Sequence, residues 1–280
     1  ISNIISNTGK YDQTIDSLSN SFTFNRIINS PGINFKWNKK KINLSLGTTV
    51  GINRFIQQNN TDSESYTYNF TNVFPQASIN YKPKPNTSLR FNYNGSGTAP
   101  SLEQLQPIRD NLDPLNQFIG NPDLKQSFQH RFSTSFNSYN VLKQKGIYTS
   151  LNYSVWQNAF TQSSIVDNVG RRTYNTVNTD GNYSLNLYST YNFTIPDTKW
   201  QLGFGPTANI TRSSDFINNQ KNVNNNNRLG FEFSVNQYIK DKYNFNIQPN
   251  IGYIKSSSSI NKSASASFWQ LGGWLSGNIH

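Results

Sequence analysis

The chain has no cysteine and no methionine among its 280 residues, and only 14% of its residues are charged. Without cysteine it cannot form disulfides, thiolate zinc sites or a cysteine nucleophile. Its charged fraction lies well below the roughly 25% of a typical soluble domain. No apolar run approaches the ~20 residues that a bilayer-spanning helix requires. These absences exclude a helical membrane protein, a disulfide scaffold and an electrolyte-rich disordered tail.

The missing methionine also bears on the extent of the chain. There is no initiator residue, and no charged-then-apolar signal peptide follows Ile1. We therefore expect residues 1–280 to be an internal piece of a longer or processed protein.

Aromatic and small neutral polar side chains dominate what is present. The 19 Phe, 15 Tyr and 5 Trp are too many large apolar groups for a disordered segment. There are also 44 Asn and 34 Ser, and Asn forms both helices and strands poorly. Two interpretations follow: a low-complexity tract, or strands in which Asn and Ser alternate with apolar residues.

The order of the residues favours strands. From residue 199 the even positions are apolar and the odd positions are Gln, Gly, Thr or Asn, and residues 183–195 and 243–253 alternate in the same way. A period of two places apolar and polar side chains on opposite faces of a strand. These runs exceed the 5–6 residues of an average strand and match the ~9–11 that a tilted membrane strand needs.

Short and long connections separate the alternating segments. We expect short turns at residues 38–41, 83–86, 142–145, 196–198 and 240–242, and long loops at 57–65, 95–125, 216–227 and 255–262, with a further excursion at 167–180. Short turns at one rim and long loops at the other are typical of an up-and-down outer-membrane barrel, with periplasmic turns and extracellular loops. We expect about eleven strands, at residues 20–38, 41–56, 65–82, 87–96, 126–141, 146–166, 171–195, 199–215, 228–239, 243–255 and 262–278.

The alternative fold is a soluble β-sandwich, as in a secreted adhesin. Against it stand the strand length, the nearly uncharged strand centres, and aromatic residues near the short turns, where a barrel carries an aromatic girdle; these residues are Phe35, Trp37, Tyr81, Phe193, Trp200, Tyr238 and Tyr243. The predicted fold class is therefore all-β: a transmembrane antiparallel β-barrel, with residues 1–280 forming one partial domain. Eleven strands is an odd count for a bacterial single-chain barrel, so we expect further strands elsewhere in the protein.

Much of the net charge of +11 lies at the short-turn rim. Ten lysines lie there: Lys39, Lys40, Lys41, Lys82, Lys84, Lys143, Lys145, Lys199, Lys240 and Lys242. This rim either contacts anionic lipid headgroups or keeps tight turns soluble. Nucleic acid is not an expected partner, because no basic groove interleaves with stacking aromatics.

The longest loop carries a resemblance to a known family. Residues 100–106, 110–115 and 120–124, followed by the aromatic strand of Phe128, His130 and Phe132, resemble a segment of TonB-dependent receptor β-barrels, in particular the Bacteroidetes-type outer-membrane barrel family. The resemblance implies an energised importer: a 22-stranded barrel, a plug domain inside it and a TonB box. The expected function is uptake of a metal chelate, cofactor, peptide or glycan, and a passive or assembly-type barrel without a plug is the alternative.

The same loop supplies candidate contact residues. Ser101 is positioned to cap a short helical turn over 102–106. Charged side chains could contact a ligand or the plug, or the loop could fold on itself at the rim. The candidates are Glu103, Arg109, Asp110 and Asp113 in the loop, and Arg90, Arg131 and Arg212 in strand bodies, where ordinary hydration of the lumen is the alternative.

No catalytic constellation stands out. His130 and His280 are the only histidines, which leaves little material for a metal site or a catalytic triad. Glu232 lies on the polar parity of its strand and is expected to face the lumen, and Gly203 and Gly205 suit close packing or bending of a strand. We therefore expect no enzyme activity, no cofactor and no metal.

Overall fold

The computed structural model describes residues 3–4, 9, 13–14, 22–60, 65–106 and 115–279. Strands make up most of these ranges. None of the helices within them combines the length and the apolar character of a bilayer span. The chain divides into two compact units, residues 1–33 with 48–74 and residues 34–47 with 75–280.

The first unit is a small antiparallel arrangement centred on one phenylalanine. Phe55 is only 2% exposed, and the rings of Phe24 and Phe70 meet it edge-on at centroid distances of 5.5 and 5.4 Å. The guanidinium of Arg26 lies 5.0 Å from the centre of the same ring. The strands of this unit are β1 (Asn3–Ile4), β2 (Gln13–Thr14), β3 (Phe22–Asn29) and the parts of β5 (Ile42–Asn59) and β6 (Ser65–Lys84) within residues 48–74.

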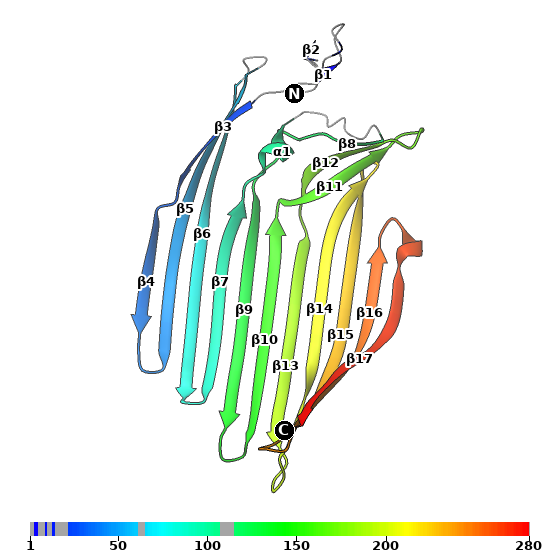
Figure 1. Cartoon of the computed structure of the whole chain (residues 1–280). Helices are drawn as coiled ribbons and strands as arrows, with labels where there is room; N and C mark the ends of the chain where they lie inside the picture. The colour runs from blue at the N-terminus through cyan, green and yellow to red at the C-terminus, as the bar shows by residue number, and fades with distance from the viewer. Residues whose placement is uncertain are drawn as a thin grey trace. The chain divides into compact units, whose positions relative to one another are not determined.

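The second unit is one long antiparallel sheet in the order β17-β16-β15-β14-β13-β10-β9-β7-β6, drawn side by side in Figure 1. Within the described ranges β17 pairs with β16 alone, so the sheet is not closed into a barrel. Its elements are β7 (Thr87–Thr98), α1 (Leu102–Leu105), β8 (Asn116–Phe118), β9 (Ser127–Asn140), β10 (Lys145–Gln157), β11 (Ala159–Val166), β12 (Arg172–Thr179), β13 (Asn182–Thr194), β14 (Trp200–Ile217), β15 (Gln220–Ile239), β16 (Tyr243–Ser258), η2 (Lys262–Ala264) and β17 (Ala266–Ile279), with the adjoining parts of β4 (Gly32–Asn38), β5 and β6.

The five predicted short turns are confirmed. They lie between consecutive strands at residues 39–41, 85–86, 141–144, 195–199 and 240–242. Three of them place a residue in the left-handed region: Gln144 at φ 45°, Asp197 at φ 58° and Asp241 at φ 57°. Asp adopts this conformation more readily than most residues because its short side chain can bond the local backbone.

The predicted loop at residues 216–227 is wrong. Strands β14 and β15 run through it and are joined by a turn at Asn218 and Asn219, which have φ 49° and 64°. Two successive positive φ values are what a tight hairpin turn needs, and Asn supplies them. The following asparagines pair in the ladder, with Asn225 opposite Ser257 of β16. The Asn-rich composition therefore belongs to strands.

Three predicted strands are each divided in two. Residues 20–38 break at Ser30 and Pro31 into β3 and β4. Residues 146–166 break at Asn158 (φ 50°) into β10 and β11, and residues 171–195 break at Gly181 (φ 94°) into β12 and β13. The outer halves, β11 and β12, pair with each other, and β11 also lies parallel to the end of β14. Figure 1 shows this hairpin leaning across the ends of β14 and β15.

The pairing register separates an apolar face from a polar face across the second unit. Residues directly opposite each other in an antiparallel pair point to the same side of the sheet. Leu185 lies opposite Ile210, and the next residue, Asn186, lies opposite Asn209. The apolar face includes Leu151, Tyr153, Leu185, Leu187, Tyr191, Phe204, Ile210, Leu229, Phe231, Phe233, Ile251 and Tyr253. The polar face includes Ser150, Asn152, Asn186, Asn192, Gly203, Gly205, Asn209, Arg228, Glu232 and Asn250.

The apolar face is uncovered in the described part of the chain. Leu229 is 52% exposed, Phe233 45% and Phe204 41%. A β-sandwich would bury these side chains against a second sheet. The alternation predicted from the sequence is therefore confirmed, and the sandwich alternative is not.

Candidate functional site

The polar face is lined by amide and hydroxyl side chains that bond to one another across strands. Asn209 donates to Asn186, and Asn246 donates to Asn236. Farther along, Trp274 Nε1 donates to Gln248 Oε1 at 2.8 Å. Such bonds orient the amides and leave further donors and acceptors free to meet water or a polar partner.

In the described ranges Arg90, Arg131, Arg228 and Glu232 on this face form no ion pair. Arg90 lies opposite Ser135 and Arg131 lies opposite Asn94, so both arginines share the polar face of β7 and β9. Glu232 lies there too, as expected. In the described ranges the one ion pair is elsewhere, between Arg171 and Asp167. The arginines therefore offer positive charge to whatever the face contacts.

Arg212 differs from the sequence expectation. It lies opposite Tyr183 on the apolar side of β14. The expectation that it shares a lumen with Arg90 and Arg131 is therefore wrong. Tyr183 lies on the same face of β13 as Leu185 and Leu187. Because Arg212 pairs with Tyr183, it lies on the apolar face, although the apolar residues of β14 before it end at Ile210.

Two glycines on the polar face of β14 make hollows beside Glu232. A Cβ on Gly205 would lie 1.8 Å from the carbonyl oxygen of Ser189, and one on Gly203 would lie 2.2 Å from Asn192 Oδ1. Close packing of the kind predicted from the sequence is thus confirmed. Glu232 lines the open hollow of about 220 Å³ at these glycines and also a second hollow that reaches Arg228.

The loop after β7 begins with the predicted cap. Ser101 Oγ accepts a hydrogen bond from the backbone N–H of Gln104, and Gln104 Oε1 accepts one from the N–H of Ser101. This reciprocal capping box satisfies free donors at the start of a helix. Leu105 is fully buried beneath the turn, whereas Glu103 is exposed on its outer side.

Residues 120–125 are fixed against this capped turn. The backbone N–H of Asn121 donates to the carbonyl of Gln104 at 2.6 Å. A Cβ on Gly120 would lie 1.8 Å from the carbonyl oxygen of Gln106, so a side chain does not fit there. Asn121 Oδ1 also accepts from the N–H of Asp123 at 3.0 Å. The last stretch of the family resemblance, residues 120–124, is therefore a turn packed on α1.

The same segment is bonded to the hairpin of β11 and β12. Asn121 Nδ2 donates to the carbonyl of Thr176 at 3.0 Å. Asn178 Oδ1 accepts from the N–H of Lys125 at 2.7 Å, and its Nδ2 donates to the carbonyls of Lys125 and Asn158. β8 extends the contact by pairing in parallel with β12.

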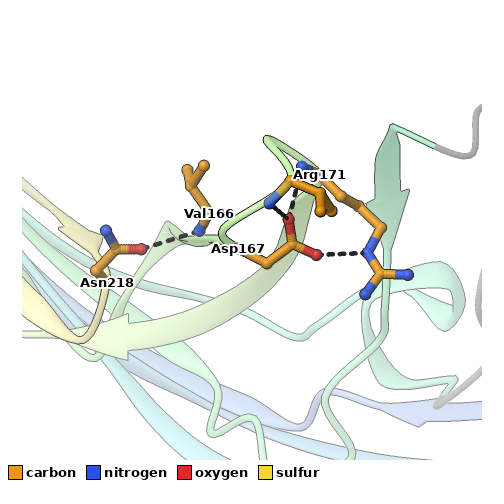
Figure 2. A network of polar contacts seen from close by, with 5 residues as sticks. Val166, Asp167, Arg171 and Asn218 are labelled. Atoms are coloured by element: carbon orange, nitrogen blue, oxygen red, sulfur yellow. Dashed lines mark hydrogen bonds and ion pairs between the residues drawn. The ribbon is translucent and has the colours of Figure 1, made fainter.

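The tip of the hairpin is bonded in turn to the β14–β15 turn. Asn218 Oδ1 accepts a hydrogen bond from the N–H of Val166 at 2.9 Å, and Asp167 Oδ2 accepts one from Nε of Arg171 at 3.0 Å (Figure 2). Partial desolvation raises the pKa of Asp167, but the N–H groups of Arg171 and Val169 and the guanidinium outweigh it and hold the pKa below its ordinary value. We call the connected segments α1, residues 120–125, β8, β11, β12 and the β14–β15 turn the rim platform.

The sequence matches the family model for the outer membrane protein beta-barrel family over residues 2–279. The chain belongs to the outer membrane protein β-barrel family. It is therefore a protein of the cell outer membrane, and its sheet is wall of a β-barrel. In such a wall the lipid hydrocarbon contacts the apolar face, because a charged side chain on the lipid face at mid-membrane would cost about 2–4 kcal/mol.

The outer membrane protein also resembles two solved structures in fold. The siderophore receptor PirA from Pseudomonas aeruginosa is 8% identical with a TM-score of 0.48, over 94% of this chain and 58% of that one. A mutant of the ferric enterobactin receptor PfeA from the same organism, in complex with enterobactin, is 8% identical with a TM-score of 0.39, over 82% and 49%. The chain thus spans about half the length of these receptors. No curated protein sequence matches it.

The rim platform of this outer membrane protein gathers some of the predicted loop residues. Glu103 lies on α1, within the platform. Arg109, Asp110, Asp113 and His280 lie outside the described residues. Asn178 and Asn218 were missed, because their partners are more than fifty residues distant in sequence. The turn at Gly170, within the excursion predicted at residues 167–180, is confirmed. In the described ranges no three His, Asp or Glu side chains form a metal cluster.

Proposed function

We propose that this chain is the barrel portion of a TonB-dependent receptor, of the Bacteroidetes type, that imports a nutrient by an energised step. A plug domain of the same full-length protein would lie against the polar face and connect it to TonB. The proposal includes no catalysis and no cofactor. It places the long-loop rim outside the cell and the lysine-rich turns in the periplasm.

The rim platform is the observation that carries the proposal. Its central turn, residues 120–125, includes one of the three stretches that resemble TonB-dependent receptors, and in the structure it is held by α1 on one side and Asn178 on the other. An ordered rim presents its side chains in a fixed geometry without loss of entropy when a ligand arrives. A receptor for a scarce nutrient needs binding side chains in a fixed geometry, whereas a passive pore needs only an open channel.

The polar face supplies the second support. Its amides offer hydrogen bonds to a polar filling, and the hollows at Gly203 and Gly205 accept side chains projecting from such a filling. Arg90 and Arg131 provide unpaired positive charge for carboxylates of a plug or an anionic nutrient. Glu103 lies exposed at the entrance.

The test is nutrient-limited growth of the source cells, with the gene for the full-length protein deleted or restored. Four limiting supplies are compared: a ferric chelate, a cofactor, a peptide and a glycan. We expect deletion to abolish growth on one of them, and inactivation of TonB to have the same effect. Arg90→Gln with Arg131→Gln should lower uptake of that nutrient, while Lys143→Gln at the short-turn rim should not.

A passive or assembly-type barrel predicts different results. Growth through a passive barrel would survive loss of TonB, and the purified protein would give a steady open conductance in a planar bilayer. Either result would rule out the energised importer.

A further inference from the structure

The apolar face has a hollow over the middle of β15 and β16 that the import proposal does not use. Leu229 and Phe231 of β15, Ile251 and Tyr253 of β16 and Trp269 of β17 surround about 430 Å³ of open space. The rings of Tyr253 and Trp269 are 5.3 Å apart and form its outer border. The hollow lies on the face of the wall, so pairing of a further strand with the edge of β17 would not cover it.

Two cations lie just beyond this hollow on the same face. Lys255 follows Tyr253 by two positions on β16, and it lies between Asn227 and Ser267 of the neighbouring strands. Arg212 lies two strands away, opposite Asn225. By strand geometry their Cα atoms are roughly 10 Å apart across the strands and about 7 Å along them. Both side chains are exposed, and neither forms an ion pair in the described part of the chain.

The heights of the two cations agree. Arg212 comes 12 residues after Trp200, the first residue of β14, and Lys255 comes 12 residues after Tyr243, the first residue of β16. At ~3.3 Å per residue and a tilt of about 45°, each lies roughly 28 Å above the aromatic short-turn rim. The apolar band of such a barrel is about 25 Å tall. The cations therefore sit at headgroup level, and the hollow sits in the hydrocarbon directly below them.

We propose that this is a binding site for an anionic lipid, with phosphate on Arg212 and Lys255 and an acyl chain in the hollow. The headgroup would neutralise two positive charges that form no ion pair in the described part of the chain. Asn225, Asn227 and Ser257, on the same face between the cations, supply hydrogen bonds to phosphate oxygens. The acyl chain would cover Tyr253 and Trp269, whose amphipathic rings favour the interface. The site does not depend on energised import, because it lies on the opposite face from the lumen.

The experiment uses quenching of Trp269 by brominated lipids. The full-length protein, purified in a non-ionic detergent, is titrated with dibrominated phosphatidic acid or dibrominated phosphatidylcholine in mixed micelles. The signal of Trp269 is obtained by subtracting that of the Trp269→Phe variant. We expect phosphatidic acid to quench at a lower mole fraction, by about five-fold for each cation, which is the effect of one basic residue near an anionic lipid surface.

Two double variants test whether the preference for phosphatidic acid arises at Arg212 and Lys255. Arg212→Gln with Lys255→Gln should equalise the two lipids, whereas Lys143→Gln with Lys145→Gln, at the other rim, should leave the preference unchanged. In the unmodified protein, 1 M salt shortens the Debye length to about 3 Å and should abolish the preference, so the test does not depend on assembly of a variant.

Three outcomes would overturn the site: equal quenching by both lipids in the unmodified protein, a preference that survives in the double variant, or a preference that persists in 1 M salt. Inorganic phosphate is added as a competitor to distinguish a bound lipid from a free anion. If it removes the preference at the same concentration as phosphatidic acid, the cations bind a free anion and the lipid assignment fails.

Discussion

Asn178 and Lys125 are bonded reciprocally: the Lys125 N–H donates to Asn178 Oδ1 at 2.7 Å, and Asn178 Nδ2 donates to the Lys125 carbonyl at 2.9 Å. The amide thus imitates a backbone partner and connects the loop after α1 to β12. Asn178 Nδ2 also donates to the carbonyl of Asn158, where β10 gives way to β11. One side chain therefore connects three segments of the rim platform.

Replacement of Asn178 by Ala should release residues 120–125 from the hairpin. Each lost hydrogen bond costs about 1 kcal/mol, and the carbonyls left behind add to it. We expect exchange of the Lys125 amide to rise by about ten-fold or more, measured by hydrogen–deuterium exchange on the purified protein. Asn175→Ala, on the same strand, is the matched control. Unchanged exchange at Lys125 would show that the turn is held by other contacts.

The features that the sequence predicts correctly depend on a residue and its near neighbours in the chain. A barrel strand in a membrane has apolar side chains on its lipid face and polar ones on the other face, so the alternation at Leu185 and Asn186 can be recognised without knowledge of the partner strand. The cap at Ser101 is equally local, since donor and acceptor are three residues apart. These predictions are confirmed in the structure.

The errors come from partners distant in the chain. The run from Asn224 to Asn227 is typical of a loop by composition, yet pairing with Ser256, Ser257 and Ser258 makes it strand. The parallel contacts of β8 with β12 and of β11 with β14 join segments more than forty residues apart. Local pattern carries no information on such pairings. The error at Arg212, by contrast, has a local cause: Arg212 occupies an even position in the alternation that begins at Trp200, and that parity alone places it on the apolar face.

Substitution of Gly120 by Ala should displace α1 from the turn. The new Cβ would lie 1.8 Å from the carbonyl oxygen of Gln106, and backbone cannot yield as a flexible side chain can. Forcing a methyl group into a packed site costs about 1–3 kcal/mol. We expect faster proteolysis within residues 100–125 while heat-modifiable gel mobility stays normal. In the matched variant Gly252→Ala, the nearest atom is Arg228 Nε at 3.3 Å, so proteolysis should not change.

Order at the tip of the β11–β12 hairpin should depend on pH through Asp167. Its pKa is lowered below the ordinary value of 3.8, so the folded tip favours the carboxylate. The stabilisation is fully present above the ordinary pKa, and it is lost as the pH falls through the lowered one. We expect the protection of the Val169 and Arg171 amides to fall as the pH is lowered from 6 to below the ordinary pKa of 3.8, relative to Asp167→Asn. The variant keeps an acceptor oxygen without the charge, so its protection should stay constant. Equal pH dependence in both proteins would exclude Asp167 as the titrating group.

The two faces of β13 should respond oppositely to the same substitution. Leu185 lies between Tyr153 and Ile210 on the apolar face, and Asn186 lies between Asn152 and Asn209 on the polar face. Arginine at Leu185 would place a charge in hydrocarbon at a cost of about 2–4 kcal/mol, whereas arginine at Asn186 would remain in water. We expect Leu185→Arg to prevent assembly in the outer membrane and Asn186→Arg to assemble, scored by heat-modifiable mobility in outer-membrane fractions. Because the positions are adjacent, strand propensity and distance from the rims are matched. Equal assembly of the two variants would mean that the apolar face does not contact lipid, and the lipid site at Lys255 would fail with it.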